Sequence, residues 1–196
     1  MGLNKDTLEL YIHIPFCIKK CDYCDFLSDP VSRAGQEAYI YALLREIKEA
    51  ASREKRPVST LFIGGGTPSV LPVDLMELLL RELSEQFRFL PEAECTIEAN
   101  PGTLTEEKLV LYRKYGLNRI SIGLQSPVDK ELKMLGRIHD YREFLESYEL
   151  ARNVGFDNIN VDLMFAIPGQ SYEGWGRNLR TVAALAPEHI SAYSLI

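Results

Sequence analysis

The chain carries three of its four cysteines in one short stretch, at Cys17, Cys21 and Cys24. Thiolates spaced this closely, as C-x3-C-x2-C, repel one another unless a cation holds them, so the array predicts a metal ion or an iron–sulfur cluster. A [4Fe–4S] cluster held by only three thiolates leaves one iron without a protein ligand, and a small molecule can bind there. Disulfides are a poorer explanation, because no secretion signal opens the chain.

Two other interpretations fit the same spacing. Cys17, Cys21 and Cys24 fall at i, i+4 and i+7, which would place them on one face of a helix. Pro15 before them and the charged residues among them argue against such a buried stripe. A zinc site that adds His13 to the three thiols stays open on spacing alone.

Length and charge indicate a one-domain protein and argue against nucleic-acid binding and a membrane span. The chain has 196 residues, of which 46% are hydrophobic, and this suits one domain over residues 1–196. Its net charge is −6, and its densest basic run, Arg53–Arg56, contains an acid, so nucleic acid is not an expected partner. No apolar run approaches the ~18 residues of a membrane span. We expect a reducing, cytoplasmic compartment.

The elements that must position the cysteines follow an alternating pattern. Strands are predicted over residues 8–14, 60–64, 94–98, 119–123, 158–165 and 189–196. Helices are predicted over residues 33–51, 73–87, 105–115, 141–154 and 172–185. This alternation indicates an α/β fold with parallel strands, and six units predict a partial (β/α)6 barrel that is open on one side.

Local signals set some of the helix ends. The third helix begins either with a capping box of Thr103 and Glu106 or with Thr105 as its cap. Gly116 is a C-terminal stop, and Asp140 opens the fourth helix. Cys95, His139 and His189 are expected to be structural.

Unusual residues gather just after the predicted strands, which in such barrels share one rim. Gly64–Thr67 brings three glycines to a strand end, either to admit a ligand to the main chain or to make a tight turn. Glu98, within an apolar strand, needs a partner, which can be a ligand or a structural arginine. Gln125, Arg137 and Asp162 have the same two interpretations.

Taken together, these stretches resemble the radical S-adenosylmethionine (SAM) superfamily. The nearest resemblance within it is to the oxygen-independent coproporphyrinogen III oxidase-like family. The cysteine array, with Tyr23 before its last thiol, is similar to that superfamily's signature. The further matching stretches are residues 11–17, 64–69, 96–101, 121–126, 135–139 and 160–170.

The resemblance implies a [4Fe–4S] cluster on Cys17, Cys21 and Cys24, with SAM chelated to the open iron. Reduction of the cluster would cleave SAM to methionine and a 5′-deoxyadenosyl radical. The residues that the resemblance places around SAM are Tyr11, Tyr23, Gly65, Gly66, Thr67, Glu98, Gln125, Arg137 and Asp162.

Two departures refine the resemblance. The oxidase pattern has a fourth cysteine where this chain has Phe26, and this favours the heme-chaperone branch, which binds heme and passes it to an acceptor. The alternative is an oxidase that decarboxylates coproporphyrinogen III, so heme or a porphyrinogen is the expected partner, with an unidentified heme acceptor and electron donor. The chain also stops inside its sixth predicted strand, so we expect a radical SAM core that lacks the family's C-terminal domain.

Overall fold

The computed structural model describes residues 6–195. Its strands are β1 (Leu8–Ile14), β2 (Val58–Gly65), β3 (Phe89–Ala99), β4 (Arg119–Gln125), β5 (Ile159–Phe165) and β6 (His189–Ser194). Its helices are α1 (Arg33–Arg53), η1 (Pro68–Val70), α2 (Val73–Gln86), α3 (Glu106–Lys114), α4 (Asp129–Met134), α5 (Tyr141–Asn153) and α6 (Tyr172–Ala183). The predicted alternation is therefore confirmed.

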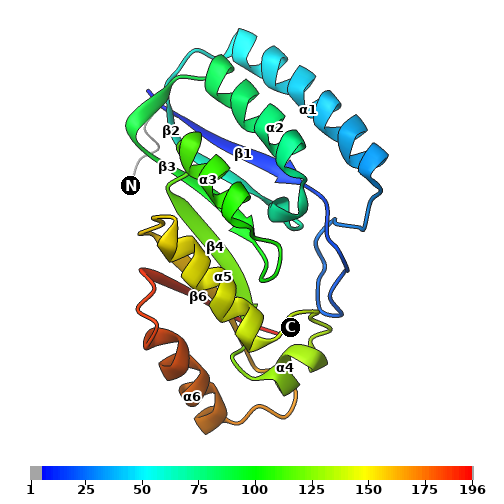
Figure 1. Cartoon of the computed structure of the whole chain (residues 1–196), viewed down its shortest axis with the longest axis vertical. Helices are drawn as coiled ribbons and strands as arrows, with labels where there is room; N and C mark the ends of the chain where they lie inside the picture. The colour runs from blue at the N-terminus through cyan, green and yellow to red at the C-terminus, as the bar shows by residue number, and fades with distance from the viewer. Residues whose placement is uncertain (1–5, 196) are drawn as a thin grey trace.

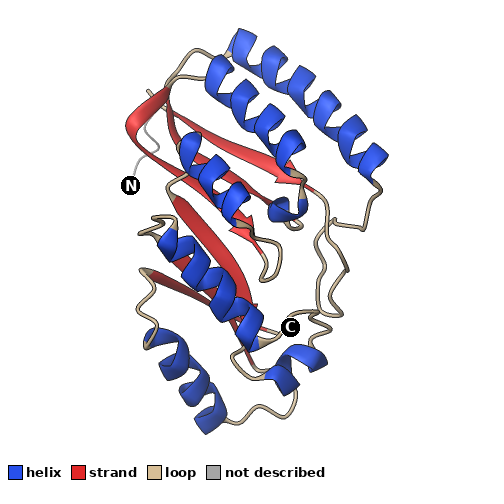
Figure 2. Cartoon of the chain, in the orientation of Figure 1, coloured by secondary structure: helices blue, strands red, loops and turns tan. Residues whose placement is uncertain are grey.

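The six strands form one sheet in the order β1-β2-β3-β4-β5-β6, and every neighbouring pair is parallel. Within the described part of the chain, no pairing joins β6 back to β1. The long helices lie on one face of the sheet (Figures 1 and 2). This is the predicted partial (β/α)6 barrel, and among the described residues its open side lies between the two edge strands, β1 and β6.

Alternation along the strands separates two faces. The outer face, under the helices, carries fully buried apolar side chains such as Ile63, Ile97 and Ile122. The inner face carries polar or aromatic ones, among them Glu98 and Asp162. The structure thus buries a hydrophobic core on one side of the sheet and keeps chemistry on the other.

Several element boundaries differ from the sequence prediction. The short helix α4 was not predicted, and β3 begins earlier than expected, at Phe89. The α3 cap is Thr105, whose side chain accepts from the Lys108 N–H, so the alternative with Thr103 is wrong. The expected last strand is confirmed as far as Ser194, and Ile196 lies outside the described residues.

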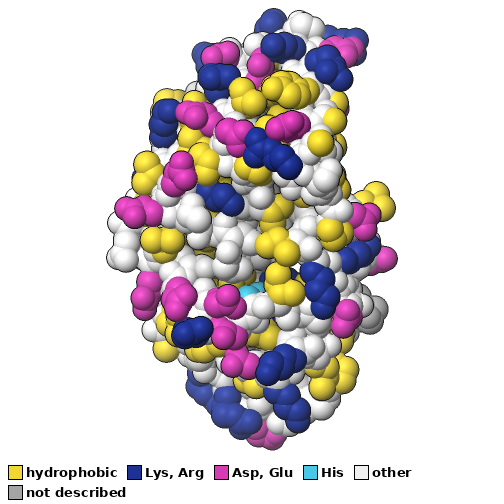
Figure 3. Space-filling view, turned by 45° about the vertical axis from the view of Figure 1, so that its right-hand side comes forward, with side chains coloured by type: hydrophobic (Ala, Val, Ile, Leu, Met, Phe, Trp, Pro, Cys, Tyr) yellow, Lys and Arg dark blue, Asp and Glu magenta, His cyan; other side chains and the backbone are white. Residues whose placement is uncertain are grey.

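On the face in Figure 3, basic and acidic side chains are interspersed rather than gathered into one basic patch. Among residues 6–195, no helix is long and apolar enough to cross a membrane.

Candidate cluster and cofactor site

The loop that carries the cysteines is joined to the glycine turn by main-chain hydrogen bonds. Ile14 at the end of β1 pairs with Gly65 at the end of β2. The Gly66 N–H then donates to the Ile14 carbonyl at 2.9 Å, and the Thr67 N–H donates to the Phe16 carbonyl at 2.7 Å. The expected closeness of the first strand to the glycine turn is confirmed.

Close approach explains the glycines of this turn. A Cβ on Gly66 would lie 2.7 Å from the Phe16 carbonyl oxygen, and Gly65 has φ +118°, a conformation that side chains disfavour. The Gly65 N–H donates to Glu98 Oε2 at 3.0 Å. Because the N–H groups of Gly65, Gly66 and Thr67 are all engaged, a ligand at this main chain would bond to carbonyl oxygens. The Thr67 carbonyl already accepts from the Val70 N–H at 3.0 Å.

The three thiols lie on one loop, and the helical interpretation of their spacing is wrong. Residues 15–32 form turns and bends without a helix. Cys17, Cys21 and Cys24 are half-buried and free of disulfides. The Cys17 Sγ lies 3.4 Å from the Thr67 hydroxyl, and the Cys21 Sγ accepts from Arg137 Nη1 at 3.6 Å. Two of the three sulfurs therefore lie within hydrogen-bond distance of polar side chains.

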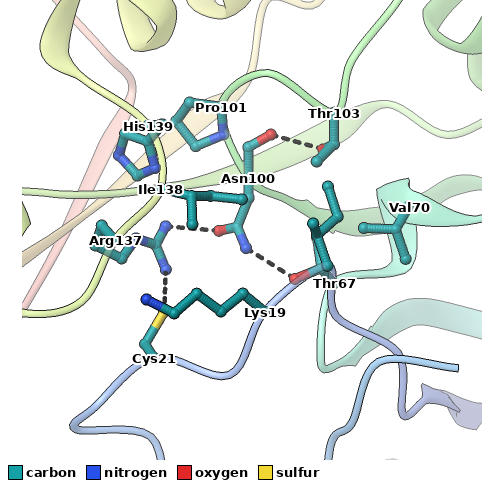
Figure 4. A pocket seen from close by; sticks show the side chains of 11 residues that line it. Lys19, Cys21, Thr67, Val70, Asn100, Pro101, Thr103, Arg137, Ile138 and His139 are labelled. Carbon is teal, nitrogen blue, oxygen red and sulfur yellow. Dashed lines mark hydrogen bonds between the residues drawn. The ribbon is translucent and has the colours of Figure 1, made fainter.

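Arg137 connects the cysteine loop to the strand ends. It follows α4, and its Nη2 donates to Asn100 Oδ1 at 2.8 Å and to the Gly123 carbonyl. Its Nη1 also reaches the Tyr23 hydroxyl at 3.3 Å. Figure 4 shows the guanidinium between Asn100 and Cys21. Its Nε is buried without a hydrogen-bond partner among the described residues.

These contacts suit an iron–sulfur cluster. No three His, Cys, Asp or Glu side chains within residues 6–195 converge to hold a single metal ion. A cluster spreads its thiolates over several irons, so its ligands need not meet at one point. His13, the fourth ligand of the zinc alternative, bonds through Nδ1 to the Tyr11 hydroxyl at 3.1 Å. The unpaired Arg137 Nε is the kind of donor that a group bound beside the thiols would satisfy.

Glu98 is a carboxylate on the inner face with one hydrogen-bond donor within residues 6–195. Among the described residues its hydrogen-bond partner is the Gly65 N–H and not an arginine, so the alternative of a structural arginine is wrong here. Burial raises its pKa to about 7, and the Gly65 hydrogen bond only partly opposes this. Tyr11 lies on the same face, 58% exposed and stacked on Phe62 with ring centroids 6.1 Å apart.

Asp162 is held by a polar network instead. Its oxygens accept from Asn160 Nδ2 at 2.8 Å and from the Ser121 hydroxyl at 3.3 Å. Burial raises the pKa of Asp162, whereas these hydrogen bonds lower it. The carboxylate between two apolar neighbours in sequence is therefore accounted for by Asn160 on its own strand and by Ser121 on the neighbouring strand β4.

Gln125 ends β4 in a strained conformation. Its φ is +72°, which is rare for a residue with a side chain, and the strand register shifts at this point. The buried side chain accepts from the Tyr193 hydroxyl at 2.5 Å. Tyr23, on the cysteine loop, packs against Leu135 and Met164, and burial raises its pKa to about 12.

Sequence reasoning missed one residue of this rim. Asn100 lies within the matching stretch 96–101, but its sequence context predicts no role for it. Its Nδ2 donates to the Thr67 hydroxyl at 2.8 Å while its Oδ1 holds Arg137. His139 and Cys95 are buried as expected, and burial lowers the pKa of His139 to about 4.

The chain belongs to the Radical SAM superfamily, as the arrangement of its fold and thiols indicates: the superfamily profile matches residues 11–182. Curated relatives include "Heme chaperone HemW" of Escherichia coli, 43% identical over 96% of this chain and 50% of that protein. The same-named protein of Haemophilus influenzae is 41% identical over 96% of this chain and 51% of its own length. The chain thus spans about half the length of these relatives.

A solved structure supports the fold. The Escherichia coli coproporphyrinogen III oxidase HemN, described as a radical SAM enzyme, superposes with a TM-score of 0.90 at 33% identity. The match covers 97% of this chain and 44% of that one. The resemblance drawn from the sequence motifs is confirmed at the level of the family and the fold.

Proposed function

We propose that this chain is the cofactor-binding core of a heme chaperone, with a [4Fe–4S] cluster on Cys17, Cys21 and Cys24 and SAM beside it. The observation that carries the proposal is the hydrogen-bonded contact between the cysteine loop and the glycine turn, below an open inner face. When bound, the cluster supplies the electron that cleaves SAM, and the chain's own residues bind and orient the two groups.

The proposed SAM site extends from the glycine turn along the inner face. Carbonyl oxygens of Gly65 and Gly66 would accept from the SAM amino group, and the Thr67 carbonyl would do so with the lone pair that the Val70 N–H leaves free. Glu98, with its single main-chain partner, has acceptor capacity left for an amino or ribose hydroxyl group. The exposed Tyr11 ring offers a surface for adenine.

The remaining members of the proposed site lie further around the rim. Tyr23 and Arg137 sit next to the thiols, and Arg137 keeps only its Nε free for a ligand. Gln125 and Asp162 have partners within the chain, so SAM would share them. A strained backbone at Gln125 is typical of a binding site.

Phe26 and the named relatives favour heme transfer over decarboxylation. Phe26 is 69% exposed next to the cysteine loop and offers no thiol there. Heme titration of the anaerobically reconstituted protein tests this proposal. We expect saturable binding with a shifted Soret band, and absence of saturation would remove the chaperone function. The free thiols favour a reducing, cytoplasmic compartment.

The second candidate function is oxidative decarboxylation of coproporphyrinogen III. The observation in its favour is the TM-score of 0.90 to an oxidase. Product analysis under anaerobic, reducing conditions decides between the two. Formation of protoporphyrinogen by the SAM-loaded protein would favour the oxidase, and its absence would favour the chaperone.

A further inference from the structure

A continuous hydrogen-bonded chain links two of the proposed cluster thiols through residues far apart in sequence. The Cys17 Sγ contacts the Thr67 hydroxyl, which accepts from Asn100 Nδ2. Asn100 Oδ1 accepts from Arg137, and Arg137 donates to the Cys21 Sγ. The links come from the β2 and β3 ends and the loop after α4, and most of them are visible in Figure 4.

Arg137 is the cationic member of this chain of contacts, and several hydrogen bonds anchor it. Nη2 is bound by Asn100 and the Gly123 carbonyl, which leaves Nη1 directed at the cysteine loop. A Cβ on Gly123 would lie 3.1 Å from Nη2 and 2.7 Å from Asn100 Oδ1, so glycine is what allows this approach. The guanidinium geometry is therefore set by the strand ends and not by the thiols.

The loop before Arg137 also holds the cysteine loop in place. The Asp22 N–H donates to the Leu135 carbonyl at 3.3 Å, and Lys19 Nζ donates to the Gly136 carbonyl at 3.4 Å. A Cβ on Gly136 would lie 2.7 Å from the Asp22 carboxylate. Cys21 sits between these two contacts in sequence, so its sulfur stays within reach of Nη1.

We propose that Arg137 is a positioning residue that tunes the cluster: it donates a charge-assisted hydrogen bond to the Cys21 thiolate and raises the reduction potential of the cluster. This inference rests on the proposed function. Reduction adds negative charge to the cluster and its sulfurs, and a fixed cation with an N–H directed at one sulfur stabilises that added charge. Such outer contacts tune bound metals without touching them.

This tuning role, which uses Nη1, is separate from the contact with SAM that the free Nε could make. Four of its five N–H groups already bond to Cys21, Tyr23, Asn100 and Gly123. A SAM ligand would be expected to change SAM affinity when removed, whereas a tuning residue changes the potential of the cluster in the absence of SAM. The two roles thus separate in one experiment.

The test is a redox titration of the anaerobically reconstituted chain without SAM, followed by absorption and EPR, together with iron and sulfide analysis. In R137Q we expect the reduction equilibrium constant to fall at least tenfold, about 59 mV toward negative potential for one electron. R137K keeps the positive charge but loses the planar guanidinium, and N100A removes the acceptor that holds Nη2. In both variants the reduction potential should therefore shift in the same direction as in R137Q, but by less.

Arg119→Gln is the matched control, because Arg119 is a half-buried arginine of the same sheet that bonds to Thr96 at 3.4 Å, away from the thiols. It should keep the wild-type potential. If R137K and N100A both keep the reduction potential of the wild type, the inference is overturned, even if R137Q takes up no iron. Weakened SAM binding in R137K with an unchanged potential would also overturn it. If the wild-type chain itself contains no stoichiometric iron and sulfide, the proposed function fails instead.

Discussion

The two faces of the sheet are built on opposite principles. The outer face is apolar and mostly buried, because the long helices lie over it (Figure 1). The inner face holds Glu98 and Asp162 in partial exposure, and its contacts join distant parts of the chain. Most of the packing that stabilises the protein therefore lies between the helices and the outer face. The inner face and its rim can bind ligands with little loss of folding stability.

The largest expected effect lies at the rim. Replacing Cys21 by serine should abolish cluster uptake, because serine is a poor ligand for iron in such clusters, while the helical circular dichroism stays unchanged. The measurement is iron and sulfide content after anaerobic reconstitution. Cys95→Ala is the control: this thiol is buried in the core, so the variant should load normally. Full cluster content in Cys21→Ser would contradict the assignment.

The second effect concerns stability on the outer face. Phe144 on α5 is completely buried, so Phe144→Ala should lower the free energy of unfolding by about 3–5 kcal/mol. Phe62→Ala, on the inner face of β2, removes the same atoms from a half-buried site and should cost clearly less. Urea unfolding of both variants makes the comparison. Equal losses would contradict the difference between the faces.

The third effect is a pH dependence that comes from Glu98. Its folded pKa of about 7 lies above the ordinary glutamate value of 4.5, so the folded state binds more protons than the unfolded state between these values. Stability should therefore fall as pH rises through this window, by up to ~3 kcal/mol in total. Glu98→Gln keeps an oxygen for the Gly65 N–H and removes this loss.

Urea unfolding at pH 4.5 and pH 8 measures this effect as a difference between Glu98→Gln and the wild type. The variant should gain on the wild type as pH rises. A constant difference across the window would show that Glu98 has an ordinary pKa and is not desolvated.

The smallest expected loss of stability comes from the N-terminal cap of α5, a helix on the outer face. Asp140 caps α5 in a reciprocal capping box with Glu143. Asp140→Ala should lower the free energy of unfolding by about 1 kcal/mol, and Asp140→Ser should lower it less because serine keeps the cap acceptor. Thermal unfolding measures both. A loss as large as that of Phe144→Ala would mean that the start of α5 contributes more to the free energy of unfolding than we infer.

The sequence predicts the sheet well because its signals are local. Apolar runs mark the strands, and caps such as Asp140 mark helix ends. The rim could be predicted as a set of residues but not as a network. The hydrogen bond from Arg137 to Cys21 joins residues 116 positions apart, and α4 is too short to show a helical period.

Contacts of this kind depend on tertiary placement. Asn100 looks like an ordinary strand end in the sequence, and only the folded chain brings it between Thr67 and Arg137. Glu98 shows the same limit, because its partner is a main-chain N–H, and a backbone group leaves no sequence signal.

The central claim is that three thiols hold a cluster whose remaining iron is open to SAM. EPR of the reduced, reconstituted chain before and after addition of SAM tests this most directly. We predict that SAM changes the g values of the cluster signal, since a new ligand on one iron alters its electronic structure. An identical spectrum at saturating SAM, from a sample with full iron and sulfide content, would contradict the account.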